Sequence, residues 1–312
     1  VFAGKGGVGK TTLACATALR LAGDSPQKAV LLLSADPAPS LSACLDFPLR
    51  ATPTRVAPGL WAMEIDAQAQ FDTLKQQYRE ELNEFLESAL SNLDLAFDRE
   101  VMERILDLSP PGLDEVMALT GVAQLLAQGA YDIVVVDSAP TGHLIRLLEL
   151  PELMDQWLKA FFGILLKYKR LFRLPGITQR LVDISRNVKR FRALLGDPRK
   201  SAVYAVSILT RMAFEETKDL LQACERMGIS TPLLFLNLAT SAGTCGLCCS
   251  LQRREQQIRR QFREAFPDRQ QPLVYRQEEP RGLEDLEALG RLLYSPVAGE
   301  EPAIMSCPTT RR

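Results

Sequence analysis

The residues with the clearest chemical meaning lie within the first dozen positions of the chain. Gly4, followed at the required offset by Gly9, Lys10 and Thr11, matches the P-loop pattern GxxxxGK[ST]. In such a loop, successive backbone N–H groups surround phosphate oxygens, the lysine adds positive charge, and the threonine hydroxyl can bind Mg²⁺. A Gly-rich turn without a ligand explains the glycines but not the Lys-Thr pair. The predicted phosphate cradle consists of Gly4, Lys5, Gly6, Gly7, Val8, Gly9, Lys10, Thr11 and Thr12.

Lys5 is a second lysine beside the first glycine of this loop. A phosphate cradle within one subunit does not require it. Two interpretations stay open: the side chain reaches across an interface to the nucleotide of a partner, or it is an ordinary solvated lysine.

Three further polar residues end short apolar runs that are typical of buried parallel strands. Asp36 follows the run Ala29 to Ser34, and Asp137 follows the run Ile133 to Val136. Because ligands bind outside the carboxyl ends of such strands, both carboxylates are predicted to approach the phosphates. Asp137 has the Walker-B arrangement, in which the carboxylate helps to hold Mg²⁺ and its waters. Asn237 ends the run from Leu233 and either contacts a base edge or is a turn residue.

The elements that position these residues alternate between strand and helix. A strand over 1–3, the P-loop and a helix over 13–22 come first, and strands over 202–208 and 233–237 enclose a helix over 214–227. This alternation predicts an α/β P-loop NTPase with a doubly wound, mostly parallel sheet and an inserted α-helical subdomain. We expect one ATPase domain over 1–294 and a flexible tail over 295–312.

The inserted segments, at about 68–128 and 152–200, are predicted to be helical. Between residues 152 and 200 there are 12 Lys or Arg against 4 Asp or Glu, so this second segment is basic. Its first helix, 152–174, carries an unusually broad apolar side formed by Met154, Trp157, Leu158, Phe161, Phe162, Leu165, Tyr168, Leu171 and Phe172. A second helix is predicted to end at Gly196. These helices form either a core layer or a surface for an apolar helix of another protein.

Cys245 and Cys248 form a C-x2-C pair in a predicted Gly-containing loop. Structural zinc needs four ligands and the pair supplies two, while the only histidine, His143, is poorly placed to help. If zinc binds here, the simplest source of the missing ligands is the same pair from a second copy. Free thiols and a redox-switchable disulfide are the competing interpretations.

Charge and hydropathy of the sequence argue against a nucleic-acid-binding, membrane-spanning or secreted protein. The formal net charge is -1 and the pI is about 6.1, which gives no reason to expect nucleic acid as a partner. No apolar run reaches the roughly 18 residues that span a bilayer, and no signal peptide is recognisable. We therefore expect a cytoplasmic protein with reduced cysteines. The opening Val1 reads as the end of a truncated strand, so we expect the natural N-terminus to be missing.

Taken together, these residues resemble the arsenical-pump ATPase family, and within it most closely the soluble ATPases that target tail-anchored membrane proteins. The resemblance extends from the first residues to about Tyr294. It rests on the P-loop with its additional lysine, on two switch-like segments, and on several shorter matches. These matches are Asp36-Pro37-Ala38, Pro111-Gly112-Leu113-Asp114-Glu115, Asp137-Ser138-Ala139-Pro140-Thr141-Gly142-His143, Asn237, Cys245 with Cys248, and Glu279-Pro280-Arg281-Gly282.

The resemblance implies a homodimer that hydrolyses ATP with Mg²⁺. The resemblance implies three catalytic residues: Asp36, Lys10 and Lys5. Asp36 is implied to position the attacking water, and Lys5 to act on the nucleotide of the opposing subunit. Thr11 and Asp137 are implied to hold the metal, directly or through water. Asn237 and Arg281 are implied to contact the nucleotide, with Asn237 at the adenine, and Cys245 and Cys248 to bind Zn²⁺ across the dimer.

The family divides by cargo. Metalloid pumps resemble two fused halves with cysteine ligands, whereas this chain has one half and no cysteine between residues 45 and 223. The resemblance therefore favours a client groove over 68–128 and 152–200 for hydrophobic transmembrane helices, with transient visits to a membrane receptor. A metalloid-efflux ATPase and a redox-switched, ATP-independent holdase are the alternatives. Pro39 departs from the histidine that is frequent in the family, and Met154 is the only methionine between residues 152 and 200.

Overall fold

The computed structural model describes residues 1–34, 40–65, 125, 129–138, 182–183, 186–187, 189–190, 192–243, 245–294 and 303–304. The chain divides into two compact units. The first comprises residues 1–65, 129–145 and 194–312, and the second comprises 66–128 and 146–193. Every element discussed below belongs to the first unit.

This unit is built on one sheet, which has nine strands within the described residues, in the order β3-β4-β2-β5-β1-β6-β7-β8-β9. All neighbouring strands are parallel except β3 and β4. The strands are β1 (Phe2–Gly4), β2 (Val30–Ser34), β3 (Thr54–Ala57), β4 (Leu60–Glu64), β5 (Ile133–Asp137), β6 (Tyr204–Ile208), β7 (Leu233–Ala239), β8 (Leu273–Tyr275) and β9 (Ala303–Ile304).

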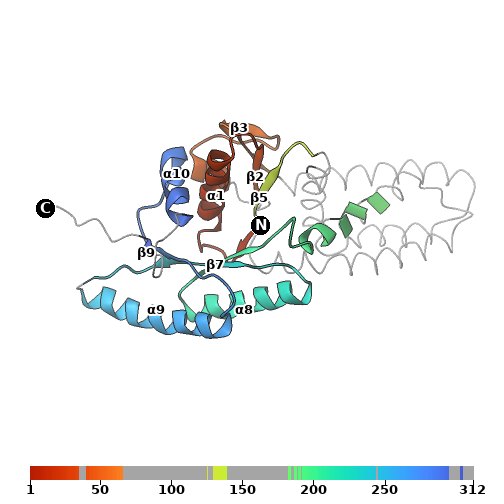
Figure 1. Cartoon of the computed structure of the whole chain (residues 1–312). Coiled ribbons are helices and arrows are strands. Elements are labelled where there is room, and N and C mark those ends of the chain that lie inside the picture. Colours follow the sequence, from red (N-terminus) through yellow and green to blue (C-terminus); the bar gives the residue numbers. More distant parts are fainter. Residues whose placement is uncertain are drawn as a thin grey trace, which may run out of the picture. The chain divides into compact units, whose positions relative to one another are not determined.

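Helices cover both faces of the sheet (Figure 1). On one side lie α1 (Lys10–Asp24), α2 (Ser40–Leu45) and α10 (Gly282–Leu293), and on the other lie α8 (Arg211–Arg226) and α9 (Gly246–Ala265). This two-sided cover makes the unit a doubly wound α/β fold of the P-loop type, as the sequence predicts.

The strands predicted from apolar runs, β1, β2, β5, β6 and β7, are all present, and so are the helices α1 and α8. Every residue of β2 is buried and all but Ser34 are apolar, as expected of a parallel strand covered by helices on both faces. The antiparallel hairpin of β3 and β4 was not predicted. β3 is only four residues long and has two polar residues followed by two apolar ones, so it carries no alternating strand pattern.

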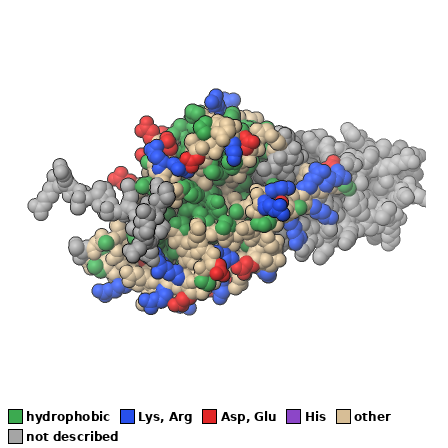
Figure 2. Space-filling model, in the orientation of Figure 1, with side chains coloured by type: hydrophobic (Ala, Val, Ile, Leu, Met, Phe, Trp, Pro, Cys, Tyr) green, Lys and Arg blue, Asp and Glu red, His purple; other side chains and the backbone are tan. Residues whose placement is uncertain are grey.

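The core of this unit lies between α1 and the sheet. Its members include Phe2 of β1, Leu13 of α1, Leu32 of β2 and Phe235 of β7, each at most 1% exposed. In Figure 2, apolar side chains gather in the middle of the visible face and charged ones lie toward its edges. The apolar packing fixes β1 and α1, and with them the loop that joins the two.

The predicted client segment over 68–128 lies outside the described residues except at residue 125, and most of the segment over 152–200 does too, as do Asp36 and His143. The predicted end of the second inserted helix is confirmed, because helix ends at Leu195 and a turn follows at Gly196. Among the helices that the structure describes, none is both long and apolar enough to cross a membrane. The tail over 295–312 is described only at residues 303–304, in β9.

Candidate functional site

The sheet order brings the predicted phosphate loop and the predicted Walker-B aspartate to the same edge. β1 lies between β5 and β6, and Phe2 of β1 is paired with Asp137, the last residue of β5. The loop over 5–9 leaves the carboxyl end of β1 and leads directly into α1. This edge is where doubly wound sheets bind their ligands.

Lys10 is the first residue of α1, and its side chain is turned back over the loop. The residue is 7% exposed, and its ammonium Nζ donates to the backbone oxygen of Lys5 at 3.0 Å. The positive charge of Lys10 is therefore held inside the loop, at the N-terminus of a helix whose dipole also favours an anion. This arrangement suits a phosphate group.

Thr11 and Asp137 are brought together from positions 126 residues apart. The Thr11 hydroxyl donates to Oδ2 of Asp137 at 2.7 Å, and Asp137 is only 1% exposed. A threonine hydroxyl and a carboxylate at one site are the oxygen ligands that Mg²⁺ uses in P-loop NTPases, directly or through water. The donor set thus fits the predicted metal.

Gly9 of the loop and Asn237 are in close contact. Nδ2 of Asn237 donates to the backbone oxygen of Val8 at 2.8 Å. Gly9 has φ of 90°, and a Cβ there would lie 2.3 Å from Nδ2 of Asn237. Glycine is therefore required at position 9 for its backbone conformation and for space.

A distortion of β7 accompanies this contact. β7 continues to Ala239, so Asn237 lies within the strand rather than at its end, which corrects the predicted boundary. Leu238 has φ of 57°, a rare conformation for a non-glycine residue, and the pairing with β8 shifts register between Leu236 and Ala239. Such irregularities often re-aim side chains next to functional sites. Asn237 thus braces the P-loop, in addition to its predicted contact with adenine.

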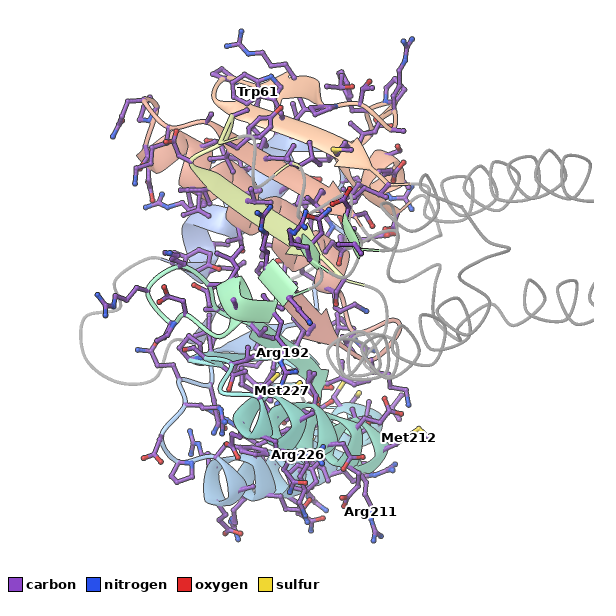
Figure 3. All side chains as sticks on the ribbon, turned by 90° about the vertical axis from the view of Figure 1, so that its right-hand side faces the viewer. Trp61, Arg192, Arg211, Met212, Arg226 and Met227 are labelled. Carbon is purple, nitrogen blue, oxygen red and sulfur yellow. The ribbon has the colours of Figure 1, made fainter. Side chains whose placement is uncertain are left out.

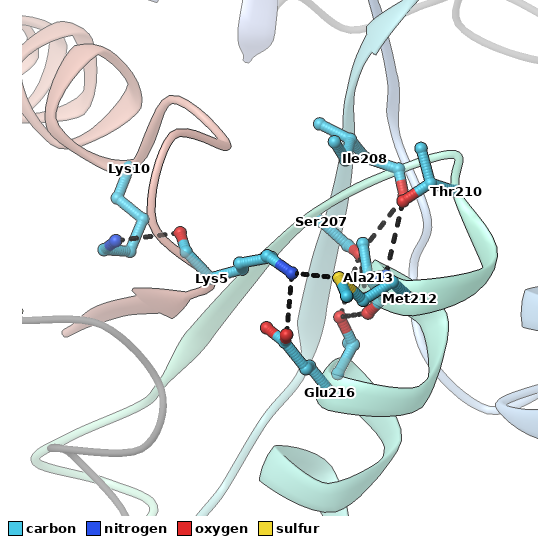
Figure 4. Close-up of polar contacts among 9 residues, drawn as sticks. Lys5, Lys10, Ser207, Ile208, Thr210, Met212, Ala213 and Glu216 are labelled. Carbon is cyan, nitrogen blue, oxygen red and sulfur yellow. Dashed lines mark hydrogen bonds and ion pairs between the residues drawn. The ribbon is translucent and has the colours of Figure 1, made fainter.

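Lys5 points out of the loop toward α8. Its ammonium Nζ lies 2.7 Å from Oε1 of Glu216 and 2.7 Å from Sδ of Met212, both in the same chain (Figure 4). Met212 is 66% exposed and projects outward from the first turn of α8, beside Arg211 (Figure 3). The side chain therefore has partners within its own chain.

Arg281 is the residue that precedes α10. Its guanidinium forms an exposed ion pair with Glu279 at 3.0 Å, and its backbone N–H donates to Asp285 at 3.3 Å. Neither of these partners of Arg281 belongs to the P-loop. Its predicted nucleotide contact stays a prediction, as does the role of Asp36.

The cysteine pair lies at the start of a helix and not in a loop, which corrects the sequence prediction. Cys245 caps α9, with its sulfur accepting from the backbone N–H of Cys248 at 3.2 Å, and the two sulfurs are 2.9 Å apart. The side-chain hydrogen bond between the two thiols, and then that from the backbone N–H of Cys248, lowers the pKa of the Cys245 thiol. The pKa of Cys248 is raised, chiefly by the same thiol contact.

Cys249, the next residue, donates its thiol to the backbone oxygen of Gly243 at 3.3 Å. Within the described ranges, no set of three or more His, Cys, Asp or Glu side chains is arranged to hold a metal ion. The pair at 245 and 248 thus fits two of the four zinc ligands, and the donors present in this part of the chain do not complete the site.

Two groups near the site were missed in the sequence. Glu64, at the end of β4, accepts from the backbone N–H groups of Leu41 and Ser42 at 2.9 and 3.1 Å and from the Ser42 hydroxyl at 2.8 Å. It thereby fixes the start of α2, which follows the predicted first switch. In addition, hydrogen bonding from Cys15, on α1, lowers the pKa of the Cys44 thiol. Contacts between distant segments carry no local sequence signal.

Comparison with known proteins gives a consistent result. The family described as anion-transporting ATPase matches residues 1–295. The chain is 28% identical to the ATPase GET3 of Meyerozyma guilliermondii, over 96% of this chain and 90% of that protein. It is 27% identical to the ATPase ASNA1 homolog of Dictyostelium discoideum, over 97% and 91%, and 30% identical to the ATPase ARSA2 of Chlamydomonas reinhardtii, over 96% and 84%.

Proposed function

This chain belongs to the family of anion-transporting ATPases, and we propose that it works as a homodimer that uses ATP to bind and release hydrophobic transmembrane segments of tail-anchored membrane proteins. The observation that carries the ATPase part is the contact between Thr11 and Asp137 beside the P-loop lysine. Near full-length similarity to an ATPase GET3 supports the same assignment.

The proposed chemistry is phosphoryl transfer to water, in which the protein mainly positions groups and stabilises charge. Lys10 and the loop N–H groups bind the phosphates, and Asp36 orients the attacking water. Thr11 and Asp137 hold Mg²⁺, which supplies positive charge at the phosphates when it is bound. Lys5 acts on the nucleotide of the partner, in the manner of an arginine finger supplied in trans.

The proposed dimer is completed by zinc. Cys245 and Cys248 converge at the exposed start of α9 and supply half of a tetrahedral site. The same pair from a second copy supplies the rest. In this arrangement the thiols of two chains cross-link the dimer through the metal, while Lys5 of each chain serves the opposite nucleotide.

The proposed client is an apolar helix, and its binding surface is the apolar-rich sequence over 68–128 and 152–200, of which the second segment is basic. A targeting role entails a cytoplasmic protein that visits a membrane receptor transiently. The absence of cysteine from residues 45 to 223 of the sequence weighs against a metalloid pump.

A redox-switched holdase is a second candidate, favoured by one observation. The sulfurs of Cys245 and Cys248 lie 2.9 Å apart and the pKa of Cys245 is lowered, so the pair is suited to oxidation to a disulfide. In that function, the oxidised chain binds unfolded protein without nucleotide.

Capture of a labelled apolar helix by the purified full chain separates these functions. A peptide with a C-terminal transmembrane segment is mixed with wild type and with Asp137→Asn, with and without ATP, first under reducing conditions and then after oxidation of the chain. The proposal predicts that ATP changes capture by wild type and leaves capture by Asp137→Asn unchanged. Capture that is indifferent to ATP and appears only after oxidation supports the holdase, and hydrolysis that is stimulated by arsenite supports the pump.

A further inference from the structure

The ammonium group of Lys5 is held by its own chain. Nζ contacts Glu216 Oε1 and Met212 Sδ, each at 2.7 Å, across 211 and 207 residues of sequence. The side chains of Lys5 and Glu216 are 31% and 39% exposed, so the ion pair is open to solvent and to an approaching molecule. The lysine proposed to act in trans is thus bound in cis.

The helix that carries Glu216, α8, is firmly held in place. α8 begins with Thr210 as its cap, whose hydroxyl accepts from the backbone N–H of Ala213 at 3.3 Å. The buried Thr217, next to Glu216 on the same helix, donates to the hydroxyl of Ser207 on β6 at 2.8 Å and contacts the oxygen of Ala213 at 2.6 Å. Glu216 therefore lies on a helix that is hydrogen-bonded to the sheet.

The lysine side of the ion pair is adjustable. The backbone oxygen of Lys5 accepts from Lys10, while the long side chain extends separately to α8. The side chain can therefore rotate away from Glu216 without breaking the contact that holds the loop. Met212 offers only a weak acceptor and does not add a second charge.

The two destinations of the ammonium compete. The Glu216 carboxylate and the phosphate of a partner's nucleotide are both negative, and each would bind the same ammonium group of Lys5. While Lys5 is paired with Glu216, its charge is not available to that phosphate. Partly exposed ion pairs contribute little to stability, so this one can open at a modest cost. Such a weak contact suits a reversible restraint.

We propose that Glu216 is a positioning residue that holds Lys5 in cis until a second copy of the chain brings its nucleotide within reach. The inference rests on the proposed role of Lys5 in trans. It adds a consequence: the ion pair raises the protein concentration at which dimer-dependent hydrolysis begins, and it restrains a charged side chain in the isolated chain.

ATPase activity measured against protein concentration tests this proposal with the full chain. Glu216→Gln keeps the shape of the side chain but removes its charge. We expect half-maximal activity at about two- to fivefold lower protein concentration than in wild type, the range that corresponds to an exposed ion pair, with an unchanged plateau. Glu216→Asp, which keeps the charge, is expected to stay nearer to wild type.

Glu215→Gln is the matched control, because Glu215 is the exposed neighbour on the same helix and carries the same charge. Thermal unfolding of each variant checks that α8 is intact. A half-activation concentration for Glu216→Gln equal to that of the control, or a lowered plateau, would overturn the positioning role.

Lys5→Ala separates this inference from the function on which it rests. If Lys5→Ala loses activity while Glu216→Gln matches the control, the trans role stands and the restraint by Glu216 is wrong. If Lys5→Ala is as active as wild type, both claims are wrong: that Lys5 acts on the partner's nucleotide, and that Glu216 restrains it. Capture of an apolar peptide is measured in a separate assay. If no peptide is captured, the client proposal is wrong, but the test of Glu216 by ATPase activity is unaffected.

Discussion

The hydroxyl of Thr11 donates a hydrogen bond to Oδ2 of the buried Asp137, and the two oxygens are 2.7 Å apart. The contact joins the first turn of α1 to the carboxyl end of β5. It gathers a hydroxyl and a carboxylate beside the loop that holds Lys10. The residues of the predicted metal site thus meet at one point of the fold.

Thr11→Ala removes one of the two oxygen groups and should reduce Mg²⁺-dependent ATP hydrolysis about 10- to 100-fold, the usual cost of weakening a metal site. Thr11→Ser keeps the hydroxyl and should retain most of the activity. A steady-state ATPase assay titrated with Mg²⁺ measures both. Equal activity of the alanine and serine variants would contradict the role assigned to the hydroxyl.

Asn237→Ala should destabilise the protein by about 1–3 kcal/mol, because the backbone oxygen of Val8 loses a buried hydrogen-bond partner. Chemical unfolding measures the free energy, and Asn237→Asp serves as a comparison that keeps the size but loses the donor. We also expect weaker nucleotide binding, since Asn237 braces the loop beside Gly9. Unchanged stability and unchanged binding of a nucleotide would count against this bracing.

Cys245 should be alkylated by iodoacetamide at a lower pH than Cys248. Its pKa is lowered by hydrogen bonds with Cys248, so its reactive thiolate forms first as the pH rises, whereas the pKa of Cys248 is raised. Mass spectrometry of the reduced, metal-free chain after brief labelling between pH 6 and 9 identifies the modified residue. Cys249→Ser controls for labelling of the third thiol, and preferential labelling of Cys248 would be the opposite result.

Zinc content should approach one ion for every two chains, because Cys245 and Cys248 supply two of four ligands and the described residues of the chain do not complete the site. Cys245→Ser should abolish binding, and a chelator should loosen the dimer. Elemental analysis combined with sedimentation measures the two quantities together. One tightly bound zinc in each strictly monomeric chain would refute the shared site.

Parts of this site could be predicted because local patterns encode them. The apolar run of β5 identifies a buried strand, and parallel strands end at a common edge, so Asp137 had to lie near the loop after β1. The P-loop residues are contiguous, and their spacing alone identifies the phosphate cradle. Thr11 and Asp137 therefore meet where the sequence predicts.

Other parts depend on packing between distant segments. Nothing in the sequence around Glu216 indicates that it meets Lys5, 211 residues away, because that contact depends on how α8 packs against β6. The contact of Asn237 with the P-loop lies beside the irregularity at Leu238, which has no local signature. Gly246 suggested a loop around the cysteines, whereas Cys245 in fact caps α9.

The measurement that tests the dimeric mechanism most directly is complementation between two inactive variants. Lys5→Ala keeps its own metal site but cannot serve a partner, and Asp137→Asn has the reverse defect. In a one-to-one mixture, half of the dimers are mixed and each has one complete site, so we predict about a quarter of wild-type ATPase activity, as expected for a symmetric pair. A mixture no more active than the two separate variants would contradict the account, because it would show that no lysine acts across the dimer.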